Sequence, residues 1–208
     1  NNPIVPIIDA TIPTLLLSQT SGNLGDLVNL AATLYTLGAP IAGLDNTITF
    51  DSIATPILAL ANGSPNCTVN PLLDKADSFF QFLPQGCSGS TCTQVRAVIQ
   101  SLSNLTAIPD GSALYTCKVK IATNAVSGIY QFVANALHAV DISSLPIPLT
   151  AISGQIGAKL PWVKQVFKNG CHCSTIETAG PLPLPSLLVP MLLVGLRRRE
   201  RNRARKHE

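Results

Sequence analysis

Charge is the property that this sequence has least of. Asp, Glu, Lys and Arg make up 12% of the 208 residues, whereas a typical soluble protein has about a quarter. Beyond residue 180 lie seven of the 14 basic residues and two of the 11 acidic ones, which leaves seven bases against nine acids, a net −2, in residues 1–179. A nucleic-acid-binding body needs Lys and Arg gathered on a folded surface. The charge distribution therefore argues against nucleic acid as a partner of the folded part.

Aromatic residues are also scarce. Phe, Trp and Tyr together account for 5% of the chain, while the hydrophobic fraction of 46% is ordinary. The core must therefore be built mainly from Leu, Ile, Val and Ala. The mean hydropathy of +0.33 indicates that apolar area remains after such a core is filled, and exposed apolar area marks ligand, partner or membrane contacts.

Catalytic and metal-binding motifs are missing. Residues 86–90 (GCSGS) lack the spacing of a G-x-S-x-G nucleophile motif, and the Asp residues stand singly where turns or helix starts explain them. Cys171-His172-Cys173 is the one cluster that resembles a metal site, but zinc ligands usually come as pairs two to four residues apart. We therefore predict that the protein is not an enzyme and holds no cofactor and no metal.

Cysteines and glycosylation sequons indicate the secretory pathway. The cysteine number is even, as expected for a disulfide set, and three N-x-S/T sequons predict glycosylation at Asn62, Asn66 and Asn104. The amino terminus resembles a mature end after removal of a signal peptide. We therefore predict an extracellular or cell-surface protein whose disulfides use Cys67, Cys87, Cys92, Cys117, Cys171 and Cys173.

The pairing of these cysteines stays open, because six cysteines allow fifteen connectivities. A bridge between Cys171 and Cys173 would be strained, since one residue separates them. We expect the four earlier cysteines to join neighbouring helices to one another and to the 171–173 stretch.

Hydrophobic periodicity predicts helices. In the proline-free stretch 110–141, apolar residues recur at steps of three and four, at Leu114, Cys117, Ile121, Ala125, Ile129, Phe132, Ala136 and Val140. Shorter helices are predicted over 23–37, 52–61, 71–83, 92–102, 149–159 and 161–169. Asn70 is expected to cap the third of these, with Pro71 at its first position, and Thr91 and Gln94 to form a capping box at the start of the fourth. The predicted fold is all-α, a disulfide-linked bundle of six or seven helices around a long central helix at about 112–140.

The chain divides into a body and a tail. Residues 1–175 are predicted to form a single helical extracellular domain, and 176–208 an apolar, proline-rich segment followed by a basic tail. Residues 180–196 carry no charge and precede RRRERNRARK, an order typical of a single membrane span. Four prolines and a short length oppose a spanning helix. Three alternatives stay open: residues 180–206 span a membrane, they bind its surface peripherally, or the tail has no membrane role.

Two functional hypotheses follow, with a structural or matrix protein as a third. In the first, the secreted protein binds lipid, another apolar small molecule or a hydrophobic surface, through a lining of Phe79, Phe80, Phe82, Ile129, Phe132, Trp162 and Phe167. Part of that set also fits the buried face of a helix. The alternative is a single-pass, membrane-tethered cell-surface protein whose glycosylated helical ectodomain makes protein–protein contacts.

Overall fold

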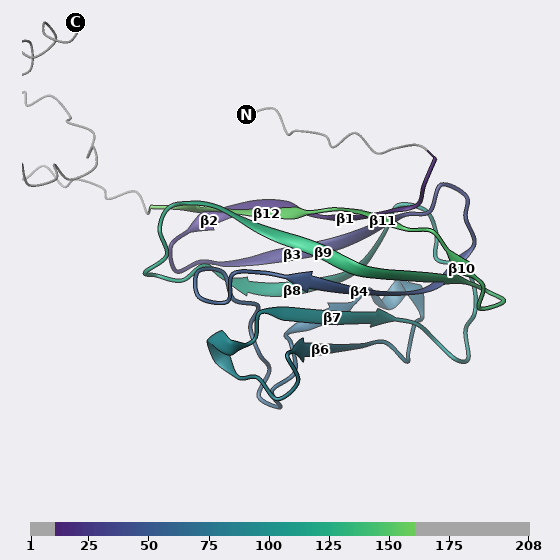
Figure 1. Cartoon of the computed structure of the whole chain (residues 1–208), viewed down its shortest axis with the longest axis horizontal. Helices are drawn as coiled ribbons and strands as arrows, with labels where there is room; N and C mark the ends of the chain where they lie inside the picture. Colours follow the sequence, from purple (N-terminus) through teal and green to yellow (C-terminus); the bar gives the residue numbers. More distant parts are fainter. Residues whose placement is uncertain (1–10, 161–208) are drawn as a thin grey trace, which may run out of the picture. The chain divides into compact units, whose positions relative to one another are not determined.

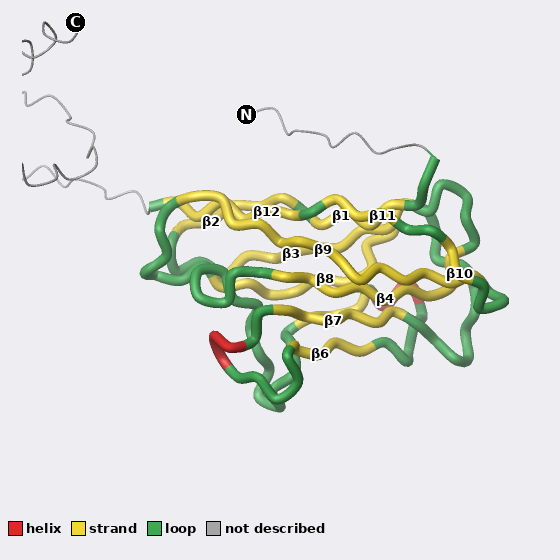
Figure 2. The backbone as a smooth tube through the Cα atoms, in the orientation of Figure 1, coloured by secondary structure: helices red, strands yellow, loops and turns green. Residues whose placement is uncertain are grey.

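Two β-sheets packed face to face form the body of this protein (Figure 1). The computed structural model describes residues 11–160, which belong to the first of two compact units, 1–163 and 164–208. In the described part, the only helical segments are the one-turn 3₁₀ helices η1 (Pro71–Leu73) and η2 (Gly89–Thr91) (Figure 2). The predicted all-α bundle is therefore wrong.

The first sheet has five strands in the order β11-β1-β3-β8-β5. Their bounds are β11 Thr150–Ile152, β1 Thr14–Leu17, β3 Leu27–Tyr35, β8 Ser112–Lys120 and β5 Cys67–Val69. The second sheet runs β2-β12-β9-β4-β7-β6, and β10 pairs with β9. Its strands are β2 Gln19–Asn23, β12 Gly154–Lys159, β9 Gly128–Asp141, β4 Ile41–Thr49, β7 Gln94–Ile99, β6 Phe79–Leu83 and β10 Pro146–Ile147.

The predicted central helix is in fact two strands and a turn. In β8, Cys117 and Val119 are buried while Lys118 between them is exposed, which is the two-residue period of a strand. The polar turn at residues 122–127 reverses the chain into β9. In β9 the alternation shifts at Ala136, which has a positive φ of 48° beside an irregularity in the β4–β9 register. The steps of three and four in β9 join residues on different sides of the strand, since Phe132 is buried whereas Ile129 and Val140 are exposed.

At one edge of the sandwich the chain passes twice from one sheet to the other. β1 pairs in parallel with β11 in the first sheet, and β2 pairs in parallel with β12 in the second. The chain changes sheet at Ser18, whose Oγ accepts a hydrogen bond from the Ala31 N–H at 2.9 Å. A Cβ at Gly154 would lie 2.7 Å from the Ser18 carbonyl oxygen, so this crossing requires glycine.

The core between the sheets is aliphatic, with one polar pair inside it. Tyr115 of β8 and Asn46 of β4 are both fully buried and exchange hydrogen bonds of 2.9 and 3.1 Å across the two sheets. Phe80 packs edge-on against the Tyr115 ring, with centroids 5.3 Å apart. Burial raises the pKa of the Tyr115 phenol far above its ordinary value. The pair fixes how β4 lies on β8, because a buried phenol without a partner is costly.

Disulfides tie the four cysteines of the described part to one another. Cys67 of β5 pairs with its register partner Cys117 of β8, and Cys87 pairs with Cys92 in the connection between β6 and β7. None of these four is thus bonded to the 171–173 stretch, which lies outside the described residues.

Removing the amide at position 46 should destabilise the fold. Asn46→Ala leaves the Tyr115 hydroxyl buried without a partner, and we expect a loss of about 2–3 kcal/mol in the free energy of unfolding. Urea denaturation followed by far-UV circular dichroism measures it. The double variant Asn46→Ala/Tyr115→Phe removes both polar groups and should lose less than the sum of the two single variants. Strict additivity would contradict the pairing.

Alkaline pH should destabilise the protein through Tyr115. The folded state keeps the phenol neutral above its ordinary pKa of about 10, whereas the phenol of the unfolded chain ionises there. The contribution of Tyr115 to the free energy of unfolding is therefore complete below pH about 10 and is lost as the pH rises further. Urea denaturation between pH 9 and 11.5 gives the slope of the unfolding free energy against pH. The slope should be smaller by about one proton in Tyr115→Phe; identical slopes would show that Tyr115 ionises freely in the folded protein.

The two disulfides should differ in their contribution to stability. Cys67 and Cys117 are 50 residues apart in the sequence and Cys87 and Cys92 only 5. Loop-closure entropy then predicts losses of about 4 kcal/mol for Cys67→Ala/Cys117→Ala and about 2 kcal/mol for Cys87→Ala/Cys92→Ala. Chemical denaturation of the two double variants tests this order, and a larger loss from the shorter loop would contradict it.

Candidate functional site

The outer side of four adjacent strands, β6, β7, β4 and β9, is called here the sheet face. The register aligns its outward residues in rows, one of which runs from Phe79 through Val98 and Asp45 to His138. A second row runs through Leu83, Gln94, Thr49 and Val133. Figure 1 shows these strands side by side with no loop or further strand layered over their outer side.

Fixed polar groups occupy the centre of the sheet face. The Thr49 hydroxyl accepts hydrogen bonds from the side-chain amides of Gln94, at 3.1 Å, and Asn135, at 3.2 Å, which links three strands. Next to it, the guanidinium of Arg96 donates through Nε and Nη2 to the carboxylate of Asp45. This ion pair holds the pKa of Arg96 above its ordinary value. These side chains are therefore oriented before any partner arrives, which lowers the entropy cost of binding.

Apolar side chains border this polar centre. Phe79 on β6 and Val133 and Val140 on β9 are exposed on two sides of it, and Ile129 extends the β9 border with 68% of its surface exposed. β6 is also an edge strand of its sheet. A polar centre between two apolar borders fits a surface that becomes covered by another molecule.

The side chains predicted to line an apolar pocket do not come together. Phe132 is fully buried and stacks on Phe50, while Phe80 and Phe82 pack against the core from inside the sandwich. Phe79 and Ile129 lie outside, on opposite borders of the sheet face. Trp162 and Phe167 lie outside the described residues. The hydrophobic lining expected from the sequence is thus divided between core and surface.

The three sequons lie away from the sheet face. Asn62 is in an exposed turn in which its side-chain oxygen accepts from the Ser64 N–H at 3.0 Å. Asn66 precedes β5 of the other sheet, and Asn104 lies in the β7–β8 connection, where its side-chain oxygen accepts from the Thr106 N–H at 3.0 Å. Glycosylation at these positions stays a prediction.

Each aspartate in the described part has a structural contact. Asp45 pairs with Arg96, and the other six bind main-chain N–H groups or a side-chain amide in turns, namely Asp26, Asp51, Asp74, Asp77, Asp110 and Asp141. The N–H groups of Leu37 and Thr36 lower the pKa of Asp110 below its ordinary value. Among residues 11–160 no group of three or more His, Cys, Asp or Glu side chains is arranged to hold a metal ion.

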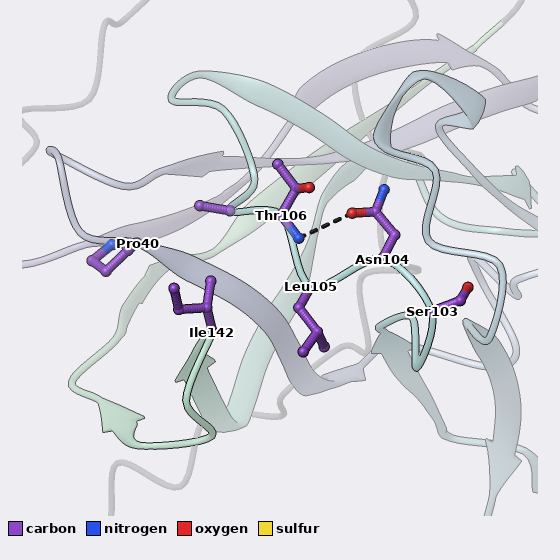
Figure 3. A pocket seen from close by; sticks show the side chains of 7 residues that line it. Pro40, Ser103, Asn104, Leu105, Thr106 and Ile142 are labelled. Carbon is purple, nitrogen blue, oxygen red and sulfur yellow. Dashed lines mark hydrogen bonds between the residues drawn. The ribbon is translucent and has the colours of Figure 1, made fainter.

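A groove opens at one end of the sandwich, and Figure 3 shows its lining. It has a volume of about 620 Å³ and is lined by Pro40, Ser103, Asn104, Leu105, Thr106, Ala107 and Ile142. None of these residues belongs to the predicted lipid-binding set. Separately, within residues 11–160 the structure has no helix long and apolar enough to span a membrane; the candidate segment 180–196 lies outside that range.

Sequence reasoning missed the sheet face altogether. One signal was present, because outward and inward residues alternate along two strands. In β4, the outward Thr47 and Thr49 alternate with the buried Asn46 and Ile48. In β9, the outward residues Ile129, Gln131, Val133 and Asn135 alternate with inward ones. Alternation over four to eight residues is typical of a half-buried strand.

Comparisons with known proteins give a fold. No protein-family model and no curated protein matches this chain. Solved structures of cohesins do match, with sequence identities of 11–14% in three examples.

The first example is a type I cohesin–dockerin complex from Clostridium thermocellum, with 12% identity and a TM-score of 0.58 over 72% of this chain and 95% of that chain. The second is the sixth cohesin of scaffoldin B from Acetivibrio cellulolyticus in complex with a mutant Cel5 dockerin, with 14% identity and a TM-score of 0.58 over 72% and 100%. The third is a non-cellulosomal cohesin from the archaeon Archaeoglobus fulgidus, with 11% identity and a TM-score of 0.53 over 72% and 92%. The body is therefore a cohesin-like β-sandwich.

Proposed function

We propose that this protein is a non-enzymatic binding module whose sheet face docks a partner protein. The observation that carries the proposal is the pre-oriented polar centre of Thr49, Gln94, Asn135 and the Arg96–Asp45 pair between two exposed apolar borders. Fixed polar groups give specificity, and the exposed aliphatic and aromatic side chains supply apolar area that association buries.

The fold supports a protein as the partner. Several of the matching structures are cohesins solved in complex with dockerins, which are proteins. The lipid or small-molecule carrier predicted from the sequence is wrong, because that prediction needed a hollow helical bundle and the body is a sandwich with a filled core. The alternative function, protein–protein contact, agrees better with the fold. The helical ectodomain that was part of this alternative is wrong, because the body is a β-sandwich.

An extracellular or cell-surface location belongs to the same proposal. Two disulfides in the described part support it, since disulfides persist in oxidising compartments.

Site-specific photo-crosslinking tests the sheet face. A benzoylphenylalanine at Phe79 on β6, in the full chain secreted by the producing organism, should form an adduct with a partner protein that mass spectrometry identifies. The control places the same group at Leu27, another exposed large apolar residue, which lies on the outer side of the other sheet. Adducts at Leu27 and none at Phe79 would overturn the proposal.

The affinity of the identified partner then gives a quantitative test. Thr49→Arg places a bulky charge in the centre of the sheet face, and we expect the Kd to rise by about 30-fold or more, since an unmatched charge in an interface costs at least about 2 kcal/mol. Thr33→Arg makes the same change on the outer side of β3 and should leave the Kd unchanged. Biolayer interferometry with the purified proteins measures both, and equal affinities for the two variants would contradict docking on this face.

A further inference from the structure

Four loops gather at the end of the sandwich that carries the groove of Figure 3. They are residues 36–41, 74–78, 101–111 and 141–147, called here the acidic loop end. Asp110 accepts from the Thr36 N–H at 2.6 Å, and Lys75 donates to the carbonyl oxygens of Asn104 and Thr106 at 2.9 and 2.8 Å. Residue 41 begins β4 and pairs with Asp141 at the end of β9, which brings the fourth loop to the same place. The loops are thus fastened to one another as one surface.

This surface is unusually rich in exposed aliphatic side chains. Leu102 is 81% exposed, and Leu37, Leu105, Ile142 and Leu145 each expose between 41 and 61% of their surface. In Figure 3, Pro40, Leu105 and Ile142 point toward the groove from three separate chain segments. The lining of the groove carries no charge, and it includes Asn104 of a glycosylation sequon, so the groove is open to a partner only when Asn104 carries no glycan. Apolar side chains clustered in this way are typical of a binding surface rather than of a free loop.

Carboxylates lie in the same four loops as the groove. Asp74 binds the Asn104 side chain at 2.9 Å, Asp77 the Leu102 N–H at 2.6 Å, and Asp141 the Leu145 N–H at 2.8 Å. With Asp110 they make four negative charges at this end. The one cation in the four loops, Lys75, is buried with its ammonium bound to carbonyl oxygens. The surface therefore combines an apolar groove with a net negative rim.

We propose that the acidic loop end binds a segment of a partner protein in which aliphatic side chains lie next to lysines or arginines. The aliphatic groups fill the groove beside Leu105 and Ile142, and the basic groups pair with the rim carboxylates. Opposite charges across an interface favour encounter and fix the orientation of binding. Two copies of this chain would not meet through their acidic loop ends, since these ends repel each other.

This surface is separate from the sheet face, so the inference goes beyond the proposed function and does not depend on it. The sheet face and the acidic loop end can each bind a partner independently of the other.

Peptide binding to the full chain tests the inference. The probes are a fluorescent leucine–arginine decapeptide, LRLLRRLLRL, and its glutamate counterpart, LELLEELLEL, measured by fluorescence anisotropy at low and at high salt. We expect the arginine peptide to bind with an affinity that falls as salt screens the charges, and the glutamate peptide not to bind.

Three variants locate the site. Asp74→Asn/Asp77→Asn keeps an amide oxygen for each hydrogen bond but removes two rim charges, and should weaken binding about tenfold. Leu105→Ser removes an exposed groove side chain and should weaken it about fivefold. Asp26→Asn, at a comparable turn between β2 and β3, is the matched control and should bind like the unchanged protein.

Several results would overturn the inference: no binding of the arginine peptide, equal binding of both peptides, or equal affinities for the Asp74/Asp77 variant and the Asp26 control. Sedimentation velocity adds a further outcome. A dimer that Leu105→Ser dissociates would make a second copy the occupant and refute a basic partner. Thr49→Arg should not alter peptide binding, which separates this result from that of the sheet face.

Discussion

The packing of two sheets around an aliphatic core is the constraint on which the rest of this structure depends. Each strand can bury one side only, so every second residue is free to serve the surface. β4 and β8 are held in place by the buried Asn46–Tyr115 pair, which a slip of either strand by one residue would break by turning that strand's member of the pair outward. The outward side of β4, with Asp45, Thr47 and Thr49, is therefore fixed by what the same strand does inside.

The low charge now has a structural explanation. Several outward positions of the central strands are filled by neutral polar residues, such as Thr49, Gln94 and Asn135, which form hydrogen bonds across strands without the desolvation cost of charges. The carboxylates are used instead in turns, where they bind main-chain N–H groups. The apolar area that the composition leaves over is real, but it lies on the borders of the sheet face and on the loops, not around an internal cavity.

The sequence predicted the residues that start turns, whereas the period of apolar residues along whole elements was misread as helical. Asn70 does cap a helical turn with Pro71 at its first position, as predicted, but that turn is the 3₁₀ helix η1 and ends at Leu73. Likewise the residues near Thr91 do form a capping box, with Ser88 rather than Gln94, on a single turn. Capping signals specify the start of a turn and say nothing about its length, which tertiary packing decides.

The error over 112–140 has a particular cause. A helical stripe requires its apolar residues to share one side, whereas in β9 the matching positions are divided: Phe132 is buried, and Ile129 and Val140 are exposed. The alternation of Cys117, Lys118, Val119 and Lys120 is the contrary evidence, because residues two positions apart lie about 200° apart around a helix, which would place the two lysines on opposite sides. The same alternation decides the surface: residues that a helix would have turned into a ligand pocket, Phe79 and Ile129 among them, are held on the outside of a sheet. A change from period 3.6 to period 2 thus replaces the predicted lipid carrier with a β-sandwich, for which we propose binding on the exterior by a partner large enough to cover a face.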